Sequence, residues 1–163
     1  MASKRKASGR LSAGILLWQR RAGRLEVLLG HPGGPFFAKK DAGAWGVPKG
    51  EVEAGEELFA VARREFAEET GHAVPDGPAI ELGEITQKGG KRVIAWAVEG
   101  DLDPVAATSN TFELEWPPHS GRKQAFPEID RVAWFDPDAA RIAIRDAQAP
   151  FLDRLDAAIR AGA

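Results

Sequence analysis

Apolar positions along this chain fall in short blocks separated by polar, glycine-containing turns, which is the pattern of β-strands. Strands are expected at residues 11–18, 25–30, 81–87, 92–98, 111–116 and 132–135. Residues 20–24 join the first two blocks, and residues 88–91, with two adjacent glycines, suit a tight turn between the next two. The pattern therefore predicts two β-hairpins, with a loop at residues 117–123 after the fifth strand.

One internal segment departs from this pattern and has apolar residues at helical spacing. Leu58, Ala62 and Phe66 recur every four residues, so one face of residues 56–70 is apolar. Gly71 follows directly, and glycine is the residue that most often ends a helix. We therefore expect an amphipathic helix over residues 56–70.

The C-terminal part of the chain predicts two more helices. Asp136 and Pro137 supply an N-cap and a first-turn proline ahead of an alanine-rich stretch. Beyond Pro150, one apolar face is formed by Phe151, Leu152, Leu155 and Ile159. Strands mixed with helices, without a repeat or a linker, indicate a single α/β domain over residues 10–163, preceded by a flexible basic tail at residues 1–9.

Composition narrows the chemistry that this domain can perform. Its 163 residues, 44% of them hydrophobic, suit one ordinary globular core. A net charge of −2 argues against a stable nucleic-acid partner, for which a basic surface is expected. The chain has no cysteine and its three histidines are scattered, so a bound metal would need oxygen ligands.

The compartment is suggested by what the chain lacks. No apolar run approaches the ~20 residues that a membrane helix needs, so we expect a cytoplasmic location and no membrane partner. The basic start is typical of targeting segments, but residues 11–18 run into Gln19-Arg20-Arg21 without a small-residue cleavage site. A mitochondrial presequence would also remove the first expected strand. The oligomeric state stays open.

Three glutamates gather near the end of the expected internal helix. At about 100° per residue, Glu65, Glu68 and Glu69 fall within an arc of roughly 100°. Like charges at these spacings destabilise a helix by about 0.2–0.5 kcal/mol per pair. A hard cation such as Mg²⁺, which takes oxygen ligands, reverses that effect. Two interpretations follow: a metal site, or a solvated acidic face neutralised by Arg63 and Arg64.

These glutamates lie within a longer motif that runs from Gly50 to His72. Its fixed positions are filled by Gly50, Glu56, Arg64, Glu65, Phe66, Glu68, Glu69 and Gly71. In this spacing the chain resembles the Nudix hydrolases, and it departs from their signature only at His72, where an aliphatic residue is usual. The lead-in at residues 45–50 and the Trp134-Phe135-Asp136 strand end extend the resemblance.

The resemblance implies a fold, a reaction and a cofactor. The fold would be a Nudix-type α/β/α sandwich with a mixed β-sheet. The reaction would be divalent-metal-dependent hydrolysis of a diphosphate linkage in a nucleotide polyphosphate, of the dinucleoside polyphosphate or nucleoside triphosphate type. The cofactor would be Mg²⁺, for which Mn²⁺ could substitute. Its ligands would be the Gly50 carbonyl, Glu65, Glu68 and Glu69.

Catalytic roles are implied by the same motif. Arg64 and Glu56 would pair and orient the helix that carries the metal ligands. The proton acceptor differs between members of the family, and our candidate is Glu128, just before the last expected strand. A surface acid in a loop is the alternative interpretation of Glu128. The residues assigned to catalysis are then Glu56, Arg64, Glu65, Glu68 and Glu128.

Substrate contacts are expected from basic side chains. Lys49 directly precedes the metal-site glycine, where its ammonium group could reach a phosphate. Other lysines and an arginine lie on expected loops and could form a cationic rim for a polyphosphate. These are Lys39, Lys40, Lys88, Lys91, Arg122 and Lys123, of which we assign Lys39, Lys88 and Lys91 to the substrate.

Aromatic side chains are the candidates for stacking on a base. Trp45 and Trp116 flank loops and are the preferred candidates, with Phe36 and Phe37 as competitors. The tryptophans expected in the core are Trp18, Trp96 and Trp134. The chain has no tyrosine, a residue that dinucleoside tetraphosphate hydrolases commonly place near the polyphosphate, and this weakens that substrate assignment.

Other functions stay open within this fold. A nucleotide-binding sensor with little turnover would normally lack some of the motif acids, and here all of them are present. A diphosphoinositol polyphosphate hydrolase would need a more basic pocket. An RNA 5′-end pyrophosphohydrolase would need a path for the RNA strand, for which Lys4-Arg5-Lys6 is the only hint. The expected partner is a small-molecule nucleotide.

Overall fold

The computed structural model describes residues 10–163, and the flexible tail expected at residues 1–9 lies outside the described residues. The strands are β1 (Leu11–Arg21), β2 (Arg24–Pro32), β3 (Lys49–Glu51), β4 (Ala79–Thr86), β5 (Arg92–Glu99), β6 (Thr111–Glu115), β7 (Lys123–Pro127) and β8 (Ile129–Phe135). The helices are α2 (Leu58–Thr70), α3 (Pro137–Ala143) and α4 (Ala149–Arg160), with 3-10 turns at Pro104–Ala106 and Asp146–Gln148. The expected strands and helices thus all form, with ends that differ by a few residues.

The main sheet is mixed and is centred on β1. Its strand order is β4-β5-β1-β2-β8, with β3 also paired to β1. β1 runs parallel to β5 and antiparallel to both β2 and β3. Along one edge, β1 pairs first with β3, at residues 12–14, and then with β2, at residues 18–21. Between these pairings, the Ile15 backbone N–H donates to the Pro48 carbonyl at 3.2 Å.

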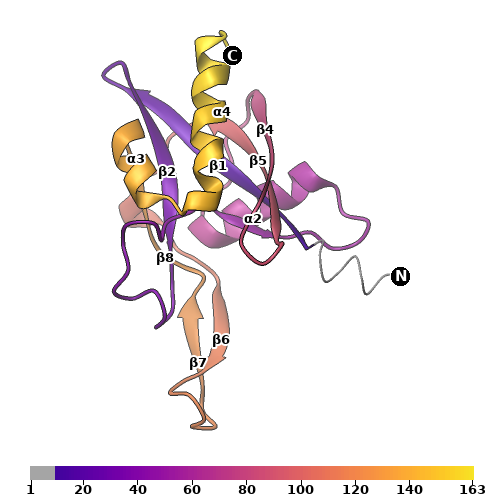
Figure 1. Cartoon of the computed structure of the whole chain (residues 1–163), viewed down its shortest axis with the longest axis vertical. Coiled ribbons are helices and arrows are strands. Elements are labelled where there is room, and N and C mark those ends of the chain that lie inside the picture. The colour runs from indigo at the N-terminus through magenta and orange to yellow at the C-terminus, as the bar shows by residue number, and fades with distance from the viewer. Residues whose placement is uncertain (1–9) are drawn as a thin grey trace.

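Helices cover both faces of this sheet (Figure 1). Alternate β1 side chains point to opposite faces, as the two-residue period of a strand requires. Ile15 and Leu17 pack with Phe66 of α2 on one face, whereas Leu16 packs with Phe151 of α4 on the other. The expected α/β/α sandwich is therefore observed, and β1 supplies apolar residues to both of its cores.

Local interactions set the ends of α2. The Glu57 side chain accepts hydrogen bonds from the backbone N–H groups of Phe59 and Ala60, at 2.9 and 3.2 Å, and caps the helix. Gly71 ends the helix in the left-handed conformation, with φ of 76°, and its N–H donates to the Ala67 carbonyl. The predicted stop is therefore confirmed, and the start lies at Leu58, two residues after the expected one.

β6 and β7 form a separate two-stranded sheet that extends away from the main sheet (Figure 1). The loop expected at residues 117–123 is shorter than predicted, because β7 begins at Lys123 and pairs with β6. β7 was not predicted, since its Lys123-Gln124-Ala125 start lacks the apolar alternation of a half-buried strand. In the part of the chain that the structure describes, no helix is both long and apolar enough to cross a membrane.

Candidate active site

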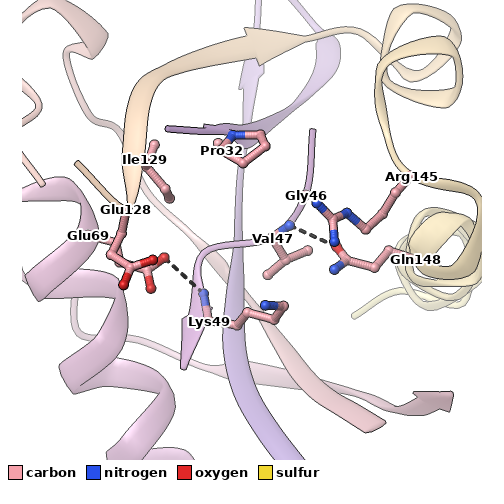
Figure 2. Close-up of a pocket in the computed structure, with 10 residues that line it drawn as sticks. Pro32, Gly46, Val47, Lys49, Glu69, Glu128, Ile129, Arg145 and Gln148 are labelled. Atoms are coloured by element: carbon pink, nitrogen blue, oxygen red, sulfur yellow. Dashed lines mark hydrogen bonds between the residues drawn. The ribbon is translucent and has the colours of Figure 1, made fainter. Parts of the chain in front are cut away.

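Two adjoining cavities open where β3, the end of α2 and the start of β8 meet. They have volumes of about 140 and 330 Å³. Four residues line both: Lys49, Glu69, Glu128 and Arg145. We call the combined space the cleft. Figure 2 shows that Glu69 and Glu128 lie at one end and Arg145 at the other, with Lys49 between them.

Gly50 lies against the Glu65 side chain at the wider part of the cleft. The pairing of β3 with β1 places Gly50 opposite Ala13, and α2 packs on the same region. A β-carbon added to Gly50 would overlap the Glu65 carboxylate. The absence of a side chain at Gly50 therefore lets the carboxylate come close to the β3 backbone.

Glu69 is a buried carboxylate at the acidic end of the cleft. It is 8% exposed, and its Oε1 accepts a hydrogen bond from the backbone N–H of Lys49 at 3.2 Å. Burial raises the pKa of Glu69 to about 8, although the attraction of Lys49 opposes the shift. Burial, together with the charge of Glu68, also raises the pKa of Glu65. A cation bound beside these two acids would favour their ionised forms.

Arg64 holds three carboxylates on the outer side of α2. Its guanidinium reaches Glu56 at 2.6 Å, Glu65 at 3.5 Å and Glu68 at 3.9 Å. A second contact fixes Glu56, whose Oε1 accepts from the Glu53 backbone N–H at 2.8 Å. The hydrogen bond from Arg64 is the main reason that the pKa of Glu56 is lowered. The structure thus brings together the expected Arg64–Glu56 pair and extends it to two of the candidate metal ligands.

The donor atoms at the acidic end suit a hard divalent cation. In residues 10–163, no group of three histidine, cysteine, aspartate or glutamate side chains is close enough to form a ready-made metal site. The Gly50 backbone, Glu65 and Glu69 nevertheless offer oxygen donors to the cleft, and the raised pKa of each acid is the effect that a bound cation would remove. Glu68 is exposed and lines neither cavity.

Glu128, the candidate proton acceptor, lies at the acidic end of the cleft. Its backbone is fixed on both sides, because its N–H donates to the Asn110 carbonyl at 2.9 Å and its carbonyl accepts from the Gly33 N–H at 3.0 Å. Its carboxylate lies near that of Glu69 (Figure 2). The structure therefore brings an acid from the second half of the chain to the acids of α2.

The predicted substrate lysines divide into two groups. Lys49 and Lys91 line the cleft. Lys39 and Lys88 are exposed and line neither of the two cavities, so the structure does not bring them to the cleft. The difference arises because Lys91 directly precedes β5, beside the cleft, whereas Lys88 lies at the tip of the turn between β4 and β5.

The structure corrects the assignment of Trp45 as a base-stacking residue. Its side chain is only 4% exposed, its Nε1 donates to Asp41 at 2.7 Å, and its ring packs edge-on against Phe135 at 4.9 Å. Arg131 lies over the same ring at 5.1 Å. Trp45 was expected to flank a loop, but an isolated β-bridge to Ile144 draws its segment into the core.

The other tryptophans fall nearer to expectation. Trp18 is buried, and Trp96 and Trp134 are half-buried against the core that α2 covers. Trp116 is half-buried on the β6–β7 sheet, where its ring meets Phe36 edge-on at 5.6 Å. Phe36 itself is 61% exposed. Neither ring lines the cleft.

Two residues of the cleft were missed by the sequence analysis. Arg145 and Gln148 lie in the segment between α3 and α4 and line the end opposite the acids. Gln148 is fully buried, accepts from the Val47 N–H at 2.8 Å and donates to the Gln87 side chain at 2.9 Å. In the sequence these residues resemble an ordinary surface turn. They reach residues 46–49 through the packing of α4 on the sheet, which no local pattern reveals.

Comparison with known proteins relates the whole domain to one family. The sequence model of the NUDIX domain matches residues 9–155. An 8-oxo-(d)GTP phosphatase of Mycolicibacterium smegmatis is 31% identical over 138 residues, which cover 79% of this chain. They cover 35% of that relative, so the chain spans about a third of its length.

Solved structures share the fold. An Ap4A hydrolase of C. elegans in a binary complex superposes with a TM-score of 0.65 and 22% identity, covering 93% of this chain and 98% of that one. The NUDIX domain of Shewanella oneidensis NrtR, complexed with ADP ribose, gives a TM-score of 0.63 and 16% identity, covering 91% of this chain and 87% of that one.

Proposed function

This chain belongs to the NUDIX domain family, and from that premise we propose that it hydrolyses a diphosphate linkage in a nucleotide polyphosphate with the help of a divalent metal ion. The observation that carries the proposal is the cleft, which has acids at one end and cations at the other. A polyphosphate bound to a metal ion is complementary to this cleft, because the metal ion suits the acids and the phosphates suit the cations.

The acidic end is the proposed metal site. The Gly50 carbonyl, Glu65 and Glu69 would hold the ion, and Glu68 would join them from the rim of α2. When bound, the metal neutralises phosphate charge, polarises a phosphoryl oxygen and lowers the pKa of water. Mg²⁺ suits the all-oxygen donor set, and Mn²⁺ is expected to substitute for it.

The remaining residues of the cleft have distinct proposed roles. The Glu128 carboxylate accepts the proton of the attacking water, because it faces the cleft beside Glu69 and its backbone is fixed by two hydrogen bonds. Arg64 keeps Glu65 and Glu68 oriented through its contacts with both. Lys49, which lies between the two ends, offsets phosphate charge.

The names of relatives support a nucleotide as the substrate. One relative is named as an 8-oxo-(d)GTP phosphatase, which supports a nucleoside triphosphate, and one structural neighbour is named as an Ap4A hydrolase, which supports a dinucleoside polyphosphate. A second candidate function is a nucleotide sensor, because the NrtR domain with this fold is complexed with ADP ribose. The intact set of motif acids favours turnover over sensing.

The test is product release from a panel of nucleotides in the presence of Mg²⁺. The panel holds diadenosine tetraphosphate, canonical and oxidised nucleoside triphosphates, ADP-ribose and a diphosphoinositol phosphate. Glu68→Gln is expected to lower the rate by about 100-fold or more without loss of the fold. Glu81→Gln, an exposed acid on β4, is the matched control and should keep the parent rate.

Two outcomes would contradict the proposal. A Glu68→Gln protein that turns over at the parent rate would exclude Glu68 from the metal site. If no nucleotide of the panel yields product but nucleotides still raise the melting temperature of the parent protein, the sensor function would be favoured.

A further inference from the structure

Within residues 10–163, Arg145 is a partly buried cation without an anionic partner. Its Nε is buried and has no hydrogen-bond partner, and among residues 10–163 no carboxylate forms a salt bridge with it. Its side chain donates a hydrogen bond from Nη2 to the Ala44 carbonyl at 3.3 Å. A buried charge without a partner destabilises a fold, so its presence beside a cleft points to an anion from outside the chain.

The backbone around Arg145 is rigidly held. The Arg145 N–H donates to the Trp45 carbonyl at 2.9 Å, and its own carbonyl accepts from the Gln148 N–H at 2.9 Å. The buried Gln148 side chain then ties this turn to Val47 and Gln87. The guanidinium is therefore presented by a fixed turn, as a preorganised binding site requires.

Two further cations line the cleft with Arg145. Lys49 and Lys91 both line its larger cavity, together with Arg145. In Figure 2 the Lys49 side chain extends away from Glu69, toward Gln148 and Arg145. The Lys49 ammonium group and the Arg145 guanidinium can therefore serve the same anion.

The position of Arg145 indicates which phosphate it serves. Glu69 and Glu128 lie at the opposite end of the cleft (Figure 2), where the proposed metal and the cleaved linkage would sit. A phosphoryl group held by Arg145 would therefore lie beyond that linkage. Guanidinium and ammonium groups are the side chains that bind phosphate most strongly.

We propose that Arg145, with Lys49 and Lys91, forms a subsite for a phosphoryl group beyond the linkage that is cleaved, so that the preferred substrates carry three or more consecutive phosphates. This inference rests on the proposed function and deepens it. It separates nucleoside triphosphates and dinucleoside polyphosphates from diphosphate-linked compounds such as ADP-ribose. Arg145 is assigned as a substrate-binding residue that selects by phosphate number.

The first test needs neither metal nor turnover. Binding of inorganic tripolyphosphate is measured by calorimetry in EDTA, for the full chain and for Arg145→Gln, Arg145→Lys and Arg24→Gln. Arg24 is an exposed arginine at the start of β2 that lines neither cavity, and it serves as the control. Arg145→Gln is expected to weaken binding at least tenfold, Arg145→Lys to weaken it less, and Arg24→Gln to leave it unchanged.

The stability of the free protein distinguishes binding from a structural role. Removal of an unpaired buried charge should leave the melting temperature of Arg145→Gln unchanged or raised, while the stabilisation by tripolyphosphate is lost. A lowered melting temperature in both Arg145→Gln and Arg145→Lys, with tripolyphosphate binding retained, would overturn the proposal.

The second test uses turnover. The kcat/KM of Arg145→Gln is expected to fall at least tenfold for ATP and diadenosine tetraphosphate, and to change less than threefold for ADP-ribose. An equal fall for all substrates would overturn the inference. So would normal tripolyphosphate binding with impaired nucleotide binding, because Arg145 would then contact the base. If the parent protein hydrolyses nothing, the proposed function fails, and the calorimetry still decides the subsite.

Discussion

Gly50 and Glu65 are packed so closely that no side chain fits between the β3 backbone and the Glu65 carboxylate. The two residues come from different elements, and the pairing of β3 with β1 at Ala13 holds the glycine in place. The obstacle to a larger residue is the end of a flexible side chain, so the acid could move aside while the fold remained.

Gly50→Ala is therefore expected to separate metal binding from folding. The added methyl group should displace the Glu65 carboxylate, weaken Mg²⁺ affinity about 10–100-fold and lower the melting temperature little. Isothermal calorimetry with Mg²⁺ and thermal denaturation check this. The double variant with Glu65→Gln should bind no worse than the weaker single variant, because both changes remove the same contact. Additive losses would contradict the shared cause.

Arg64 is expected to matter for activity and hardly for stability. The Arg64 side chain is itself 44% exposed, and ion pairs of exposed side chains contribute about 0–1 kcal/mol to folding. Without the guanidinium, Glu65 and Glu68 lose their orientation, so Arg64→Ala should lower kcat/KM about 10–100-fold. Arg63→Ala is the matched control, because the neighbouring Arg63 pairs with Asp76 at 3.7 Å and not with the motif acids. Equal losses in both variants would refute the role of Arg64.

The raised pKa of Glu69 predicts a dependence of stability on pH. Its pKa of about 8 in the folded protein lies above that of the unfolded chain, so its stabilising contribution is complete below about pH 4.5 and is lost as the pH rises through 8. The melting temperature of the metal-free protein should therefore fall between pH 6 and 8.5, and less so in Glu69→Gln. If the melting temperature falls equally in the parent and in Glu69→Gln, the pH dependence arises from another group.

Metal binding should show the opposite trend with pH. The cation binds the ionised acid, so Mg²⁺ must displace a proton from Glu69 below its pKa of about 8. The increase in melting temperature caused by Mg²⁺ should thus grow from pH 6 to pH 8.5, and proton release should be detectable by calorimetry in buffers of different ionisation enthalpy. A pH-independent Mg²⁺ effect would place the ion away from Glu69.

Trp45 is expected to act on stability. Its buried ring contacts Phe135 and His31, so Trp45→Ala should lower the free energy of unfolding by about 3–5 kcal/mol in urea titrations. Trp116→Ala, on the β6–β7 sheet, should have a smaller effect because that ring is only half-buried. If Trp45→Ala unfolds at the parent urea concentration, the ring is not part of the core.

The features that could be predicted from sequence are those set by local pattern. The period of Leu58, Ala62 and Phe66 predicted α2, and the spacing of its acids predicted the family that the match over residues 9–155 confirms. The α/β/α sandwich is confirmed by the shared fold of the solved structures. The cytoplasmic location, the lack of a nucleic-acid partner and the roles of single residues stay predictions.

Features set by distant packing could not be predicted in this way. β3 is three residues long, and its pairing depends on β1. In the sequence Trp45 resembles a loop residue, but in the structure α3 and β8 cover it. Arg145 resembles a surface cation in the sequence, but in the structure its turn packs on residues 44–45. In each case the decisive neighbour is about 30 to 100 positions away along the chain, where no local period carries information.

The division of one β1 edge between β3 and β2 also determines which kinds of sequence change this protein can accept. A substitution in residues 15–17 alters one side chain. An inserted or deleted residue between Gly14 and Trp18 would slide one pairing past the other and turn the following side chains to the opposite face. The length of this stretch thus aligns Gly50, beside Glu65, with β2, whose Gly30 and Pro32 line the cleft. Divergent relatives should therefore vary here by exchange of residues while keeping their number.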